Sequence, residues 1–478
     1  MRKKQFYFCK MPRKIKRELF EDLEVVDINS KGAGIVKSND GKVIFVQGVV
    51  PGDRITIETY KKRRGFFEAR LIGINHPSPN RVNPVCIHFG VCGGCKWQNL
   101  NYKTQLKFKQ KEVLHNLKNI SGMVLPKIDE IKAAEKPYFY RNKMEYAFSD
   151  QRWLTADEIK LKRKSLEKNG LGFHKSGMWD KVVDIEKCHL QEDPANNIRN
   201  SVKKFALDNN LVFFNHREKS GFLRTLMIRN SNQGEFMVLI QFYRENKEQR
   251  EAILNHLKDK FHLTALLYCI NSKANDTLYD QEIITYDGSE FITEVMEGIK
   301  FRINAKSFFQ TNAEQAYELY KITREFAGLK GQELVYDLYT GTGTIALFIA
   351  GKCKKVVGVE SVPEAVAVAK ENAEINGIKN TFFEVGDMRK VFNGDFINRH
   401  GVADLVITDP PRNGMHPDVI KHLLVLAPKK IVYISCNNAT QARDLSLMKD
   451  KYNLLKCRAL DMFPQTQHIE NIVLLEKI

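Results

Sequence analysis

Apolar and polar residues alternate in short runs between residues 20 and 75, and turns interrupt the runs. The turn Asn39-Asp40-Gly41, for example, separates two such runs at 34–36 and 43–46. A period of two with glycine-containing turns is typical of paired β-strands. The pattern therefore predicts a small, OB-like β-barrel over residues 14–75.

The middle of the chain is harder to interpret from its pattern. Strand-like runs at 144–148, 225–228 and 236–241 alternate with helical stretches of no clear order. We predict an α+β central domain over residues 76–300.

From residue 301 onward, short apolar strands alternate regularly with helical segments. The expected strands are 334–338, 356–359, 381–385, 404–408 and 430–434. This order is typical of a parallel sheet with helices on both faces. We predict a multidomain protein whose last domain, residues 301–478, has a Rossmann-like α/β fold.

A glycine loop, Asp337 to Thr344, follows the first of these strands and precedes a helix. Its spacing, Gly341-Thr342-Gly343, differs from dinucleotide and nucleoside triphosphate loops. The next strands end at Glu360, Asp387 and Asp409, where carboxylates can bind ribose hydroxyls or an adenine amino group. Each acid alone is more typical of a helix cap, but the ordered set favours a cofactor without phosphate.

Cys436 follows the fifth strand and lies at the same sheet edge. A thiolate there can add to C6 of a pyrimidine and make C5 nucleophilic towards a methyl sulfonium. We expect the helix starting near Ala439 to lower the pKa of the thiol. Glu470 is the candidate base for the C5 proton, with His468 as an alternative. An inert buried thiol is the other interpretation of Cys436.

A second group of cysteines consists of Cys86, Cys92 and Cys95, with Cys188 as a possible fourth member. Such thiols suit either zinc or an iron–sulfur cluster, and spacing alone does not decide. The remaining cysteines have no partners in the sequence, and we interpret them as structural: Cys9, Cys269, Cys353 and Cys457.

Charge narrows the class of partner. The 478 residues carry a net charge of +18, with basic runs at 13–17, 61–64 and 160–164. This favours a polyanion, and Phe66 beside the second run suits single-stranded RNA unless it is simply a core residue. The basic insertion at 150–170 is either an RNA contact or a solvated loop. No apolar run is long enough for a membrane span or signal peptide, so we expect a cytoplasmic protein without membrane contact.

Several motifs together resemble the RNA (uracil-5-)-methyltransferase family. They are Phe308-Phe309-Gln310-Thr311-Asn312, Asp337 to Gly343, Asp409-Pro410-Pro411-Arg412, Ser435-Cys436-Asn437 and Phe463-Pro464-Gln465-Thr466-Gln467-His468-Ile469-Glu470. The resemblance implies S-adenosyl-L-methionine as cofactor, bound with the target base by Gln310, Tyr339, Glu360 and Asp409, with Asp387 at the adenine. It also implies Cys436 as nucleophile and Glu470 as base.

The branch of this family that modifies 23S ribosomal RNA carries an N-terminal TRAM domain, which residues 14–75 resemble, and a similar cysteine pattern. The resemblance implies a [4Fe–4S] cluster on Cys86, Cys92, Cys95 and Cys188, with zinc as alternative, that supports RNA contacts without redox chemistry. It also implies methylation of a uridine in 23S rRNA by a monomer.

Other functions remain as alternatives. A tRNA uracil-5 or RNA cytosine-5 methyltransferase would use the same thiol chemistry. An amino-group methyltransferase would want an aromatic residue where this chain has Arg412, and a radical enzyme would want a different cysteine spacing. A non-enzymatic RNA-binding protein would use only the barrel and the basic runs.

Overall fold

The computed structural model describes residues 17–160, 166–392 and 394–478. The described chain forms two compact units, residues 17–84 with 96–104, and residues 85–95 with 105–478. Cys9, residues 14–16 of the predicted barrel and most of the basic runs at 13–17 and 160–164 lie outside the described residues.

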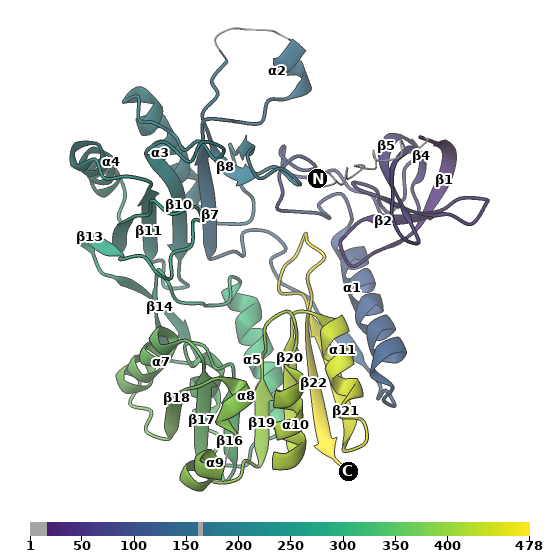
Figure 1. The fold of residues 1–478 in the computed structure, drawn as a ribbon, viewed down its shortest axis with the longest axis vertical. Coiled ribbons are helices and arrows are strands. Elements are labelled where there is room, and N and C mark those ends of the chain that lie inside the picture. The colour runs from purple at the N-terminus through teal and green to yellow at the C-terminus, as the bar shows by residue number, and fades with distance from the viewer. Residues whose placement is uncertain (1–16, 161–165, 393) are drawn as a thin grey trace, which may run out of the picture. The chain divides into compact units, whose positions relative to one another are not determined.

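The smaller unit contains a closed barrel (Figure 1). In the order in which they pair, its strands are β1 (Leu19–Ile28), β2 (Gly34–Lys37), β3 (Val43–Val46), β5 (Phe67–His76) and β4 (Arg54–Lys62). Val25, Val36, Ile44 and Ile55 fill its centre and are fully buried. Their alternation along the strands is the one that the sequence shows, so the prediction of a small N-terminal β-barrel is confirmed.

The larger unit contains two large sheets among its described residues. The first has the strand order β13 (Ile284–Gly288), β12 (Ala265–Ile270), β11 (Phe236–Phe242), β10 (Leu223–Asn230), β7 (Lys143–Ser149), β8 (Gly170–His174) and β9 (Val182–Asp184). Three helices accompany it: α2 (Ala156–Lys160), α3 (Ala195–Asp208) and α4 (Lys247–Lys260). Apolar side chains of α3 and α4 pack in one cluster with Leu226 and Ile228 of β10.

A hairpin of β14 (Phe291–Met296) and β15 (Ile299–Asn304) leads to the second sheet. That sheet has the order β18 (Thr381–Val385), β17 (Lys355–Glu360), β16 (Leu334–Leu338), β19 (Leu405–Thr408), β20 (Lys430–Ser435), β22 (Glu470–Lys477), β21 (Tyr452–Leu460) and β6 (Asp129–Lys132). Neighbours from β18 to β20 pair in parallel, whereas β22 runs antiparallel to β20.

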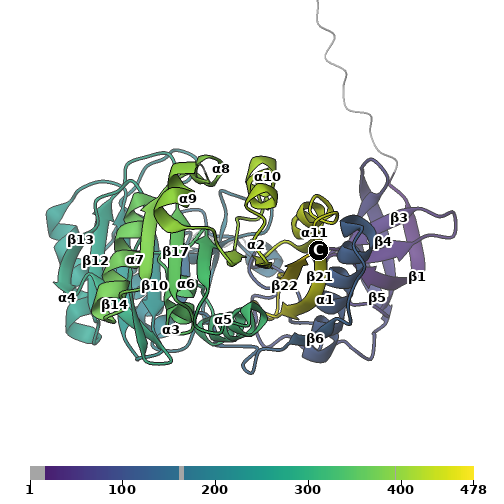
Figure 2. The ribbon, with the colours of Figure 1, turned by 90° about the horizontal axis from the view of Figure 1, so that it is seen from below.

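Helices cover both faces of this second sheet (Figure 2). One face carries α5 (Ala313–Ala327), α6 (Thr344–Ala350) and α7 (Pro363–Ile375). The other carries α8 (Met388–Val391), α9 (Gly394–His400), α10 (Pro417–Leu426), α11 (Asn438–Ser446) and apolar residues of α1 (Tyr102–Asn116) and the following π-helical turn η1 (Leu117–Ser121). The predicted parallel strands and their two covered faces are confirmed.

The register of the sheet decides which strand ends are neighbours. Leu338 of β16 pairs with Thr408 of β19, and Glu360 of β17 pairs with Val385 of β18. The residues that follow these strands therefore lie along one edge, as expected for an open α/β sheet. Across the described ranges, every helix is too short or too polar to traverse a lipid bilayer.

Candidate active site

Cys436 and Glu470 are brought together by strand pairing. Ser435, the last residue of β20, pairs with Asn471 of the antiparallel strand β22. The next residues along this ladder are Cys436 and Glu470. The charge of Glu470 acts directly on the Cys436 thiol. The sheet thus places the predicted nucleophile beside the predicted base.

The start of α11 fixes the segment around Cys436. The Asn437 side chain accepts a hydrogen bond from the Ala439 N–H at 3.2 Å and caps the helix. Its Nδ2 donates to the Arg412 carbonyl at 3.0 Å, and the Thr440 hydroxyl donates to the same carbonyl at 3.1 Å. The Arg412 side chain in turn hydrogen-bonds the Cys436 thiol. The loop after β19 is therefore attached to the nucleophile.

The Cys436 thiol is not activated in this state. Burial raises its pKa to about 11, the charges of Glu470 and Asp409 add to the rise, and Arg412 opposes it. The predicted lowering by the N-terminus of α11 is therefore wrong. Removal from water and the charges of two neighbouring carboxyl groups raise the thiol pKa by more than the partial charge of the helix end can lower it.

The two carboxyl groups beside Cys436 favour their protonated forms. Burial raises the pKa of Glu470, only 4% exposed, well above its ordinary value, and Asp409 adds to the rise. Burial raises the pKa of the half-buried Asp409 to about 7, with a contribution from the charge of Asp337. A positive charge placed among these groups would favour their ionised forms.

His468 has the opposite electrostatic environment. Burial lowers the pKa of its imidazole to about 4, helped by the positive charges of Arg412, Lys109 and Arg141. Such an imidazole is neutral at pH 7 and is a weak base. Ionised Glu470 is the stronger base, which favours Glu470 over His468 for removing a proton.

The glycine loop at the same edge is open beside Gly341 and tightly packed at Gly343. Gly341 has φ +56°, and no atom lies within 4 Å of where a Cβ would be. At Gly343, by contrast, a Cβ would come within 2.9 Å of the Phe383 ring. The fully buried Asp337 accepts a hydrogen bond from the Thr340 hydroxyl at 2.5 Å, which stabilises the turn. Tight packing thus supports one side of the loop and leaves the other open.

Glu360 and Asp387 occupy the strand ends beside this loop. Glu360 accepts hydrogen bonds from the Gly341 N–H at 3.2 Å and the Val362 N–H at 3.0 Å. Asp387 caps the short helix α8 and forms an ion pair with Arg389 at 2.5 Å. Hydrogen bonds from Arg389 lower the pKa of Asp387 to about 2. Both carboxylates thus already accept hydrogen bonds from other groups of the protein.

Gln310 and Tyr339 complete the predicted set. The Thr342 hydroxyl of the glycine loop donates to the Phe308 carbonyl at 3.4 Å, so the segment containing half-buried Gln310 lies beside that loop. Tyr339 has φ +61°, which is uncommon for a residue other than glycine. Burial raises the pKa of its hydroxyl to about 12, and Asp444, Asp387 and Glu360 add to the rise. The structure thus brings all the predicted cofactor residues to one edge.

A comparison with protein-family profiles matches residues 204–478 to the tRNA (Uracil-5-)-methyltransferase family. The matched range contains the glycine loop, Cys436 and Glu470. The chain belongs to this family. The profile match therefore confirms the family that the motifs indicated.

Relatives cover nearly the whole enzyme. An uncharacterized RNA methyltransferase of Porphyromonas gingivalis is 48% identical over 461 residues, which are 95% of this chain and 99% of the relative. One of Bacteroides thetaiotaomicron is 49% identical over 451 residues, 94% and 99% of the two chains. A crystal structure of the Pyrococcus abyssi tRNA (uracil-54, C5)-methyltransferase with S-adenosyl-L-homocysteine has a TM-score of 0.73 and 30% identity, covering 95% of this chain and 99% of that one.

Asp444 is a site residue that the sequence did not indicate. Its fully buried carboxylate accepts hydrogen bonds from the Tyr433 hydroxyl at 2.7 Å and the Met415 N–H at 2.8 Å. The Arg443 side chain, paired with Asp444, also donates to the Asn413 carbonyl at 2.9 Å. These contacts hold the loop after Arg412. An acid inside a helix carries no local signal of this role.

The four predicted metal-binding cysteines belong to the larger unit. In the described part of the chain, no group of three or more His, Cys, Asp or Glu side chains is arranged to hold a metal ion. Their thiols are nevertheless neighbours. Cys188 is buried in an apolar cluster against which Cys92 and Cys95 pack, and burial raises its pKa with a contribution from Cys86. The Gly94 N–H donates to the Cys92 sulfur at 3.4 Å. Cys92, Cys95 and Cys188 thus pack in one region, and the metal site remains a prediction from the sequence.

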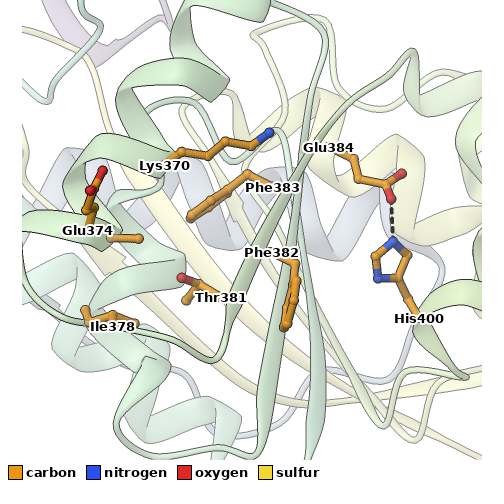
Figure 3. Close-up of a pocket in the computed structure, with 9 residues that line it drawn as sticks. Lys370, Glu374, Ile378, Thr381, Phe382, Phe383, Glu384 and His400 are labelled. Carbon is orange, nitrogen blue, oxygen red and sulfur yellow. Dashed lines mark hydrogen bonds and ion pairs between the residues drawn. The ribbon is translucent and has the colours of Figure 1, made fainter.

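A surface cavity of about 400 Å³ lies between α7 and the edge strand β18. Figure 3 shows Glu384 paired with His400 at one side, whereas Lys370 and Glu374 lie at the other side. None of the described residues that line it belongs to the predicted site. The cavity is therefore separate from the methyltransferase centre.

Proposed function

We propose that this enzyme transfers a methyl group from S-adenosyl-L-methionine to C5 of a uridine in RNA. The observation that carries the proposal is the pairing of β20 with β22, which sets Cys436 beside Glu470 at the edge that also carries the glycine loop. A nucleophile, a base and a cofactor loop at one sheet edge suit this reaction.

The cofactor residues fit S-adenosyl-L-methionine by their chemistry. The cofactor supplies an electrophilic methyl group on a positively charged sulfur. Open space beside Gly341 leaves room for a ligand, and Glu360 and Asp387 offer carboxylates for hydroxyl and amino groups. Gln310, Tyr339 and Asp409 would complete the contacts. Acidic groups with raised pKa values favour a cation in this pocket.

The side chains of this enzyme carry the remaining steps. Cys436 gives its proton to solvent and adds through sulfur to C6 of the uracil, which places negative charge on C5 and O4. Arg412 stabilises the thiolate form by its hydrogen bond. C5 would take the methyl group as the methyl–sulfur bond of the cofactor breaks, with S-adenosyl-L-homocysteine as the leaving group. Glu470 then removes the C5 proton, and the C6–S bond breaks to restore the ring and the thiolate.

For the substrate we propose 23S ribosomal RNA. The proposal rests on the TRAM-like barrel at 14–75, its basic run at 61–64, and the cysteines, which would hold a [4Fe–4S] cluster or, as an alternative, zinc. The central and catalytic domains would span 76–300 and 301–478. A monomer in the cytoplasm remains a prediction from the sequence.

A tRNA uridine is the second candidate, because the Pyrococcus abyssi enzyme in the comparison is a tRNA (uracil-54, C5)-methyltransferase. Mapping 5-methyluridine in total RNA from a deletion strain distinguishes the two. We expect the loss of 5-methyluridine at a site in 23S rRNA. Loss confined to tRNA would contradict the ribosomal proposal.

The mechanism is tested by trapping its intermediate. With Glu470→Gln, we expect a covalent protein–RNA adduct that survives denaturing electrophoresis and requires the cofactor, because C5 keeps its proton and sulfur cannot leave. Cys436→Ala should abolish turnover and the adduct while RNA and cofactor still bind. A fully active Cys436→Ala enzyme would overturn the mechanism.

The cysteine site is tested by metal analysis of protein purified without oxygen. We expect iron and sulfide, and a brown colour, as for a thiolate-bound cluster. One zinc and no iron would refute the cluster and support the zinc alternative.

A further inference from the structure

The segment from Phe139 to Asn142 connects the cysteine site with the methyltransferase centre. On one side its backbone pairs with the residues that follow Cys188. The Phe139 N–H donates to the His189 carbonyl at 2.9 Å, and the Arg141 N–H donates to the Leu190 carbonyl at 2.7 Å. The segment is therefore hydrogen-bonded to the two residues that follow Cys188, a predicted cluster ligand.

On the other side the same segment contacts the backbone of the predicted cofactor residue Gln310 and of the two residues after it. The Asn142 N–H donates to the Thr311 carbonyl at 2.9 Å, and its Nδ2 donates to the Gln310 carbonyl at 3.1 Å. Arg141 also forms a β-bridge with Asn312. Asn142 is buried, so these hydrogen bonds are shielded from water.

Tyr140 lies at the middle of this segment and is 7% exposed. Its hydroxyl donates to the Pro464 carbonyl at 3.0 Å. Pro464 belongs to the catalytic loop, which we define as residues 461–470 and which ends at Glu470. The ring of Tyr140 is in the same apolar cluster as Cys188, with Cys95 packed against that cluster.

Other contacts hold the catalytic loop from a different direction. Fully buried Lys109 of α1 pairs with Asp461 at 2.5 Å and donates to the Phe463 carbonyl at 3.1 Å. Gln105, also on α1, hydrogen-bonds Gln465 at 3.0 Å. The loop is thus held between α1 and the segment that contains Tyr140.

We propose that Tyr140 is a positioning residue through which the packing of Cys95 and Cys188 sets the position of the catalytic loop and of Glu470. The inference rests on the proposed function for the role of Glu470. The cysteines then affect methyl transfer through structure alone, because Tyr140 contacts the loop and takes no part in bond making. Loss of order at Cys95 or Cys188 loosens the loop that delivers the base.

The first test is hydrogen–deuterium exchange of the full chain, which requires no turnover. Tyr140→Phe removes only the hydroxyl, so we expect exchange in residues 461–470 to become about fivefold faster, the effect of one lost buried hydrogen bond. Tyr138→Phe is the matched control, because Tyr138 also lies near Cys86 and Cys95 but no bond from its hydroxyl to the loop is found among the described residues. Unchanged exchange in Tyr140→Phe, or an equal change in Tyr138→Phe, overturns the proposal.

The second test links Tyr140 to the cysteines. Cys95→Ser changes a half-buried side chain, and we expect it to accelerate exchange in the same loop. Because one route is involved, Cys95→Ser combined with Tyr140→Phe should exchange no faster than the more affected single variant. Independent effects that multiply in the double variant would exclude a shared route.

Kinetics separate positioning from general loosening. For Tyr140→Phe we expect kcat to fall about fivefold, while KM for the cofactor stays within about twofold. A change in KM alone contradicts the assignment. If the wild-type chain methylates no RNA, the proposed function fails, while the exchange experiments still decide whether Tyr140 couples the two sites.

Discussion

The acidic residues in the two halves of one sheet edge have different surroundings. At β17 and β18, Glu360 and Asp387 already receive hydrogen bonds from the protein, and the pKa of Asp387 falls to about 2. At β19 and β22, Asp409 and Glu470 are shielded from water, and their pKa values rise. The protein itself supplies hydrogen-bond donors to the first pair, whereas a nearby positive charge would favour the ionised forms of the second pair.

This difference separates carboxylates that stabilise the fold from carboxylates whose ionisation lowers its stability. A carboxylate with N–H and guanidinium partners adds stability when it is ionised. A carboxyl group without such partners costs stability once it loses its proton, and such costs are typical of catalytic sites. Three substitutions test this contrast.

The largest effect is expected for Asp409→Asn. Methyl transfer should fall about a thousandfold, because a charge aimed at the reacting groups is lost. The measurement is a single-turnover methylation assay. Activity within about threefold of wild type would mean that Asp409 has no major role in methyl transfer.

The same variant should be more stable than wild type at high pH. The folded-state pKa of about 7 exceeds the ordinary value of 3.8, so ionisation disfavours the folded state. The cost is absent below about pH 4, grows as pH rises, and is complete above about pH 7. We expect Tm of the ligand-free variant to match wild type near pH 4 and to exceed it by roughly 2–5 °C at pH 8. A lower Tm of the variant than of wild type at pH 8 would contradict the idea that ionised Asp409 destabilises the folded state.

A smaller effect is expected for Asp387→Asn. Asparagine can still cap α8, so Tm should change little, whereas loss of the charge should weaken cofactor binding about tenfold. Calorimetry with S-adenosyl-L-homocysteine measures the affinity. Unchanged affinity would mean that Asp387 serves only as a cap.

The smallest effect is expected for Arg412→Gln. The thiolate of Cys436 is the reactive form, so alkylation by iodoacetamide should rise about tenfold per pH unit below the thiol pKa of about 11. Without the guanidinium the pKa rises further, and alkylation at pH 8 should slow about threefold. Peptide mass spectrometry follows Cys436 separately from the other cysteines. Faster alkylation in the variant would contradict the role of Arg412.

Much of the catalytic domain could be predicted because its signals are local. The strand 381–385 agrees with β18, and 334–338 agrees with β16, since short apolar runs between helices determine parallel strands. Cys436 at the end of β20 follows from the same rule. The acids at strand ends also follow from it, because parallel strands share one carboxyl edge.

The remaining features depend on contacts between distant residues. β6 joins the far edge of the sheet through pairing with β21, and nothing in the alternation of residues 129–132 indicates that partner. Likewise, Lys109 and Asp461 form a fully buried pair from opposite ends of the chain. The raised pKa of Cys436 was missed because it depends on burial and on Glu470, and the helix end alone suggested the reverse.

The antiparallel direction of β22 makes the distance between nucleophile and base a matter of strand register. Ser435 pairs with Asn471, so the register of the backbone hydrogen bonds sets the positions of Cys436 and Glu470. Successive residues of a strand point to opposite faces, and a slip of one residue would turn Glu470 away from the thiol. A single-residue insertion at the start of β22 would therefore uncouple the two groups while both side chains remained in the sequence.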